Sequence, residues 1–198
     1  MKAVLFDYGG VLGVEDIRRT VAGLAAAFSC SARELSAPLR TWYARYEAGA
    51  LPDQQFLAGL ARDLGRKPPA AVDWAGIFQD SFTRQEEVYA IGRDLRDRGY
   101  ASGIITNMIP PFVRYLRASG GFDGFDPVVA SCEVRARKPE EAIYRAALKR
   151  LGLRPGEVAF VDDKEQNLAA AAHLGMATLH YSSPAALAAD LQRMVFSR

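Results

Sequence analysis

Polar residues that could do chemistry follow three apolar runs and one basic segment of the sequence. They are, in chain order, Asp7, Thr106 with Asn107, Lys138, and Asp162 with Asp163. Paired carboxylates are suitable ligands for Mg²⁺, and lysine and hydroxyl donors can hold phosphoryl oxygens. If the fold brings these side chains together, they would form a site for a phosphate group and a metal ion.

Strands alternate with helices in the part of the chain that carries these residues. Apolar runs predict strands at 3–7, 101–107, 127–131 and 157–163, with a weaker one at 176–181. Helical patterns lie at about 85–98, 110–119, 139–151, 164–174 and 184–196. This alternation predicts an α/β fold with a doubly wound parallel sheet. Right-handed crossovers place the carboxyl ends of all the strands at one edge, so the polar residues should meet there.

Residues 15–84 interrupt this alternation and contain no convincing strand. Ile17, Val21, Leu24 and Phe28 recur at helical spacing, and further helical patterns cover about 32–48, 53–64 and 73–82. The segment leaves after the first strand and returns before the second. We therefore expect an α/β core domain of residues 1–14 and 85–198, with a small α-helical cap domain of residues 15–84 inserted beside the sheet edge.

Composition and charge narrow the possible partners. The net charge of +2 is small and the basic residues are scattered, so we expect no nucleic-acid or membrane-surface partner. Cys30 and Cys132 lie far apart without a CxxC motif, which argues against a disulfide framework or a zinc site and favours a reducing compartment. No signal peptide or membrane span is recognisable. We expect a cytoplasmic monomer or homodimer.

Four motifs occur in order along the chain: "FDYGGVL", "IITN", "RKPEEAIY" and "FVDDKEQN". With them the sequence resembles the haloacid dehalogenase-like hydrolase superfamily over essentially its whole length. A helical cap after the first motif is also usual in that superfamily. The resemblance is closest to phosphatase-like members, including the N-terminal domain of soluble epoxide hydrolase and sugar-phosphate phosphatases.

The resemblance implies a Mg²⁺-dependent phosphohydrolase that acts on a small phosphorylated metabolite. Asp7 would attack phosphorus and form an aspartyl-phosphate intermediate. Thr106 and the amides near Asn107 would hydrogen-bond the transferring phosphoryl group, while Lys138 would neutralise its charge and keep Asp7 ionised.

The resemblance also implies a metal site and a phosphate-binding loop. Mg²⁺ would lie between Asp7, the backbone carbonyl of Gly9 and Asp163, with Asp162 adjacent to it or one layer behind. The backbone N–H groups around Gly9 and Gly10 can approach phosphate because neither residue has a Cβ. Asn167 would brace the loop.

The sequence departs from the family pattern at Gly9. Most phosphatases of the family have a second Asp there, which protonates the leaving group and then activates water. Such a general acid–base group typically contributes about 10²–10⁴-fold in rate. Two alternatives therefore stay open: a 2-haloacid dehalogenase, which needs no second Asp, and a catalytically weak regulatory or binding protein. Dehalogenation needs no metal, and without one Asp162 and Asp163 would be a costly charge pair.

The cap determines the substrate in this family, but the cap sequence carries no recognisable motif. Tyr43 and Tyr46 lie three residues apart on one predicted helix. Packing is the favoured interpretation for both, and contact with the substrate is the alternative. Arg45 and Glu47 are left open between the two roles.

Overall fold

The computed structural model describes residues 1–196 and contains a five-stranded parallel sheet with the order β5-β4-β1-β6-β7. Its strands are β1 (Ala3–Phe6), β4 (Ala101–Thr106), β5 (Val128–Ala130), β6 (Val158–Asp162) and β7 (Ala177–His180). The sequence predicts all of them to within one or two residues, including the weak last strand. The predicted parallel α/β sheet is confirmed.

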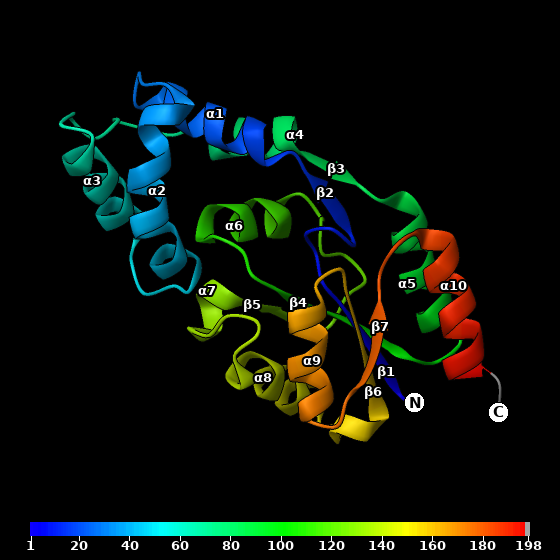
Figure 1. Ribbon diagram of the computed structural model, residues 1–198. Helices are drawn as coiled ribbons and strands as arrows, with labels where there is room; N and C mark the ends of the chain where they lie inside the picture. Colours follow the sequence, from blue (N-terminus) through cyan, green and yellow to red (C-terminus); the bar gives the residue numbers. More distant parts are fainter. Residues whose placement is uncertain (197–198) are drawn as a thin grey trace.

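Helices cover both faces of this sheet (Figure 1). They are α5 (Glu86–Asp97), α6 (Pro110–Ala118), α8 (Glu141–Leu151), α9 (Glu165–His173) and α10 (Pro184–Leu191), the last followed by a π-helical turn at Gln192–Phe196. Alternate residues of β1 face opposite layers, as a doubly wound fold requires. Ala3 and Leu5 belong to the core under α8 and α9, whereas Val4 and Phe6 belong to the core on the other face.

The segment after β1 is helical, as predicted. It forms α1 (Ile17–Ala27), α2 (Ala32–Glu47), α3 (Asp53–Asp63) and α4 (Trp74–Ser81), which lie together at one end of the molecule (Figure 1). We refer to residues 15–84 as the cap; its independence as a domain stays a prediction. None of the helices in the described part of the chain combines the length and apolar character needed to cross a bilayer.

Four short elements are absent from the sequence prediction. They are β2 (Gly13–Glu15), β3 (Phe82–Arg84), α7 (Ser131–Val134) and a 3₁₀ turn at Pro155–Glu157. Strands β2 and β3 pair antiparallel and join the cap to the sheet, so the expectation of no strand in residues 15–84 is wrong at that junction. Three residues are too few to show an alternating pattern, and the pairing joins segments about 70 residues apart.

The corner between α2 and α3 packs closely on the sheet domain. The Ser131 hydroxyl donates to the Glu47 carbonyl over 2.6 Å and accepts from the Met108 N–H at 3.0 Å. Gly49 has a φ of +67°, and a Cβ placed on it would lie 2.1 Å from the Cys132 carbonyl oxygen. The absence of a side chain at Gly49 therefore permits the cap to approach α7.

We predict that Gly49→Ala destabilises the protein more than Gly65→Ala, which serves as its matched control. Gly65 has a φ of +64° and open space around its Cβ position, so its substitution carries only the backbone cost, about 1–2 kcal/mol. At Gly49 the clash with Cys132 should add about 1–3 kcal/mol. Urea unfolding of both variants measures the difference; equal losses of unfolding free energy would show that this contact is dispensable.

Candidate active site

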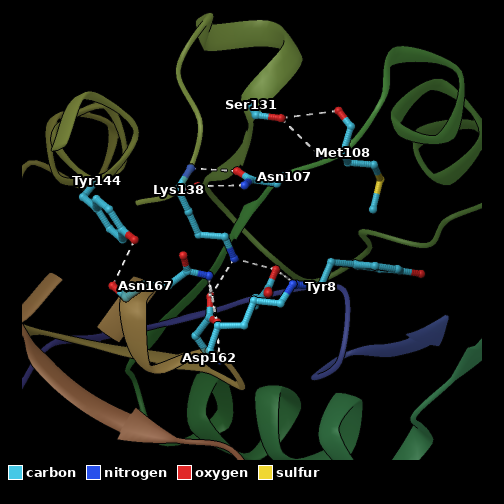
Figure 2. A network of polar contacts seen from close by, with 10 residues as sticks. Tyr8, Asn107, Met108, Ser131, Lys138, Tyr144, Asp162 and Asn167 are labelled. Carbon is cyan, nitrogen blue, oxygen red and sulfur yellow. Dashed lines mark hydrogen bonds and ion pairs between the residues drawn. The ribbon is translucent and has the colours of Figure 1, made fainter. Parts of the chain in front are cut away.

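Lys138 joins two carboxylates at the carboxyl ends of neighbouring strands. Its Nζ lies 2.7 Å from Asp7 Oδ1 and 2.7 Å from Asp162 Oδ2, and all three side chains are at most 6% exposed. Asp7 follows β1 and Asp162 ends β6, which pair with each other in the sheet. Figure 2 shows Lys138 reaching from its loop toward Asp162. The predicted meeting of strand-end residues is thus present for these three side chains.

The Asp7 carboxylate is held through one oxygen. Oδ1 accepts from the Tyr8 N–H at 2.6 Å as well as from Lys138. Burial raises the pKa of Asp7 to about 7, and the Asp162 charge adds to the rise, while Lys138 opposes both. An ionised Asp7 in this position therefore depends on nearby positive charge.

Asp162 is fully engaged by hydrogen-bond donors. Besides Lys138, it accepts from the Lys164 N–H at 2.8 Å and from Asn167 Nδ2 at 3.0 Å to each oxygen. Tyr144 in turn donates to the Asn167 carbonyl (Figure 2). These contacts fit Asn167 as a brace, and they direct the Asp162 carboxylate to Lys138.

Asp163 differs from its neighbour because its Oδ1 is buried and has no hydrogen-bond partner among the described residues. One carboxylate oxygen each of Asp7, Asp162 and Asp163 lies within 4.8 Å of the others. An unsatisfied buried oxygen in a group of acids suits a hard divalent cation, because such a cation prefers oxygen ligands. The residues present therefore fit the Mg²⁺ that the sequence implies.

The glycine loop packs against this group. A Cβ on Gly10 would lie 2.6 Å from Asp163 Oδ2, and its φ of +89° also favours glycine. Its N–H donates to the Gly13 carbonyl at 2.8 Å. Gly10 therefore leaves space next to Asp163, and its own N–H is engaged within the loop. Its predicted contact with phosphate stays a prediction. At Gly9, by contrast, a Cβ would meet nothing within 4 Å.

Asn107 holds the backbone of Lys138. Its Oδ1 accepts from the Lys138 N–H at 2.8 Å and its Nδ2 donates to the Lys138 carbonyl at 3.0 Å (Figure 2). This reciprocal pair fixes the loop from which the lysine reaches the two acids. Thr106 is buried at the end of β4 and, unlike Asn107, is not among the residues that line the neighbouring cleft.

A cleft of about 440 Å³ opens above these residues. Of the predicted site residues, Asp7, Gly9, Gly10, Asn107, Lys138 and Asp163 line it. Residues without a predicted role line it as well: Val14, Glu15, Glu47, Arg137, Lys164 and Gln166. Their positions could not be read from the sequence, except that Arg137 directly precedes Lys138 in the third motif.

The two cap tyrosines have different surroundings. Tyr46 stacks on Phe56 with ring centroids 4.0 Å apart and donates to Asp53, so the packing prediction is confirmed for it. Tyr43 instead lines the cleft, which is the alternative considered for it. Burial and the nearby carboxylates of Glu47 and Glu15 raise the pKa of the Tyr43 hydroxyl.

An ion pair crosses from the cap to the loop that carries Lys138. Glu47, which is 7% exposed, accepts from Arg137 Nε at 2.7 Å and lies 2.5 Å from its Nη2. The two residues are 90 positions apart. Glu47 therefore lies at the cleft as an ion-pair partner of Arg137, and its contact with the substrate stays a prediction.

Comparison with known proteins gives consistent matches. A sesquiterpene phosphatase from Aspergillus oryzae is 27% identical over 98% of this chain and 96% of its own length. An (S)-2-haloacid dehalogenase from Pseudomonas sp. is 27% identical over 90% of this chain and 81% of its own length. Bifunctional epoxide hydrolase 2 relatives from rat, mouse and pig extend far beyond the match, and the chain spans between 13% and 36% of their length.

Solved structures share the fold. The haloacid dehalogenase family enzyme bt-2542 from Bacteroides thetaiotaomicron, in complex with magnesium and inorganic phosphate, has a TM-score of 0.76 at 22% identity. The match covers 92% of this chain and 94% of that one. The family model described as haloacid dehalogenase-like hydrolase matches residues 1–175. The chain therefore belongs to the haloacid dehalogenase-like hydrolases.

Proposed function

We propose that this hydrolase cleaves small phosphate monoesters in a Mg²⁺-dependent reaction through an aspartyl-phosphate on Asp7. The observation that carries the proposal is the unpartnered buried oxygen of Asp163 beside Asp7. A cation bound at this oxygen would also offset the charge of the phosphate. The phosphatase relative from Aspergillus supports the same class of reaction.

In the first half of the reaction, an Asp7 oxygen bonds to phosphorus as the bond from phosphorus to the ester oxygen breaks. The ester oxygen leaves with the electron pair. In the second half, water attacks the phosphorus of the aspartyl-phosphate, which releases inorganic phosphate and restores the Asp7 carboxylate. The proton that the water loses balances the one that the leaving oxygen gains. Lys138 stays beside Asp7 throughout and offsets negative charge.

Asp7, the Gly9 carbonyl and Asp163 are the residues we expect to hold Mg²⁺. The ion would supply positive charge to the phosphoryl oxygens. Asp162 has a different role in this proposal, because its donors orient it toward Lys138. Thr106 and the backbone near Asn107 are assigned to the phosphoryl group on the family resemblance.

The dehalogenase alternative would use Asp7 and Lys138 without a cation. It would leave the buried Asp163 oxygen uncompensated next to two other acids, which is energetically unfavourable. The regulatory alternative does not explain why Lys138 is held against Asp7. We also place the protein in the cytoplasm, in line with its two unpaired cysteines.

Asp7→Asn should abolish turnover yet stabilise the metal-free fold. The purified protein should hydrolyse para-nitrophenyl phosphate only with Mg²⁺, and the variant should lose roughly 10³-fold or more of that activity. Because burial raises the pKa of Asp7 from 3.8 to about 7, the native protein loses stability as the pH rises through that interval. The Asn side chain of the variant does not ionise, so the stability of the variant should not fall over this pH interval.

Urea unfolding in EDTA should therefore show the Asp7→Asn variant more stable at about pH 8, by on the order of 2–4 kcal/mol, and equal near pH 4. A variant that keeps near-native turnover would refute covalent catalysis by Asp7. Hydrolysis of chloroacetate by the native protein without Mg²⁺ would favour the dehalogenase instead.

Asp162→Asn and Asp163→Asn should separate the two adjacent acids. Asp163→Asn should raise the Mg²⁺ concentration for half-maximal activity by about 100-fold or more, because it weakens a direct ligand and the loss of a group behind a ligand already costs about 10–100-fold. Asp162→Asn should lower kcat and change that concentration far less, because it loosens Lys138. Calorimetric titration of each variant with Mg²⁺ alone gives the same comparison without activity. Equal losses of Mg²⁺ affinity would show that both acids bind the ion.

Gly9→Asp should restore proton donation to the leaving group. Without an acid at this position, kcat/KM should fall steeply as the leaving-group pKa rises across a series of phosphate esters. The open space around Gly9 can receive a side chain, so the variant should accelerate poor leaving groups by up to about 10²–10⁴-fold. Gly9→Asn, of the same shape, should not. A flat dependence in the native protein, with chemistry rate-limiting, would mean that another residue supplies the proton.

A further inference from the structure

A second cavity, of about 340 Å³, lies in the cap between α1 and α2. We call it the cap groove. Its lining is apolar apart from Ser36 and Arg40, and consists otherwise of Ile17, Val21, Leu39, Tyr43 and Ala44. Among the residues that the structure describes, no acidic side chain lines it. This groove could take an apolar ligand, but it offers little to orient a polar one.

The cap groove adjoins the catalytic cleft. Tyr43 lines both cavities. Val14 lines the cleft and Ile17 lines the groove, and both also border a shared hollow next to Glu15. Val14 and Ile17 are 49% and 55% exposed, and they are the exposed large hydrophobic residues of the described chain. Exposed apolar surface therefore lies along the path between the two cavities.

The two cavities differ sharply in chemistry. The cleft holds the acids and Lys138 described above, whereas the groove presents aliphatic and aromatic surface. A ligand that fits both cavities would place a charged head in the cleft and an apolar tail in the groove. The groove also has the size of a small-molecule site, about 300–1,000 Å³.

We propose that the substrate is a phosphate monoester of a hydrophobic alcohol or phenol, with its phosphate at Asp7 and its apolar tail past Tyr43 in the cap groove. This inference rests on the proposed function and specifies its substrate class. Tyr43 contacts the substrate where the head joins the tail. Each methylene buried in the groove adds binding that a short ester lacks.

A series of para-alkylphenyl phosphates, from methyl to octyl, tests this inference. The leaving-group basicity hardly changes along the series, so chain length is varied alone. We expect kcat/KM in the presence of Mg²⁺ to rise by about fourfold per methylene until the groove is filled, and then to level off. Calorimetric binding of alkylphosphonates of the same lengths should show a parallel fall in Kd, and it needs no turnover.

Ala44→Trp should fill the groove and flatten the dependence on chain length in both measurements. Ala44 is exposed on α2, so the larger side chain does not disturb the core. Ala26→Trp is the matched control: Ala26 is exposed on α1 and lies outside the groove lining. That variant should keep the native dependence on chain length, and circular dichroism checks that both variants fold.

The outcomes separate this inference from the function on which it rests. If no aryl phosphate is hydrolysed, the proposed function is wrong. The dependence of the phosphonate Kd on chain length then still tests whether the groove binds the apolar tail. If the methyl ester is hydrolysed but neither kcat/KM nor Kd depends on chain length, only the present inference is wrong. A concentration-dependent dimer that Ala44→Trp abolishes in sedimentation would assign the groove to a second copy of the chain and would likewise overturn it.

Discussion

The contact of one buried lysine with two buried carboxylates is the constraint on which the site depends. Lys138 compensates Asp7 and Asp162 at 2.7 Å each, and removing charge from water is unfavourable unless its partners are placed well. Several features of the fold serve that placement. Strands β1 and β6 pair directly, Asn107 fixes the lysine backbone, and Asn167 fixes Asp162. The single positive charge of Lys138 cannot balance three acids. The group of acids therefore needs a second positive charge.

Two neighbouring acids in one motif have acquired opposite surroundings. Asp162 is the last residue of β6 and meets the lysine and two further donors, whereas Asp163 lies beyond the strand against the glycine loop. Gly10 approaches Asp163 closely, and one buried oxygen of Asp163 has no hydrogen-bond partner among the described residues. A hydrogen-bonded carboxylate is best suited to orient another group, and an unsatisfied one is best suited to bind a cation.

The sequence is sufficient to predict the sheet and the edge at which the candidate site residues meet, because both depend on local patterns. Apolar runs mark the strands, and parallel topology brings their polar ends to one edge. It does not separate Asp162 from Asp163, since their difference arises from donors on other segments. It also does not reveal the Arg137–Glu47 pair, whose partners lie 90 residues apart, or the short pairing of β2 with β3. Such contacts depend on how the cap lies over the sheet, which no local pattern encodes.

The apolar stripe of α1 contributes both to the packing of the cap and to the surface next to the catalytic cleft. Leu24 and Phe28 are buried in the core, but Ile17 of the same stripe is exposed and Val21 only half-buried. The apolar face is therefore longer than the core requires, and its surplus borders the groove next to the charged cleft. An exposed apolar patch that is contiguous and rimmed by polar residues can mark a ligand-binding groove. In the proposed substrate, Gly9 and this apolar face would act on adjacent parts of one ligand: Gly9 would affect the oxygen that leaves, and the apolar face would affect the group that the oxygen carries.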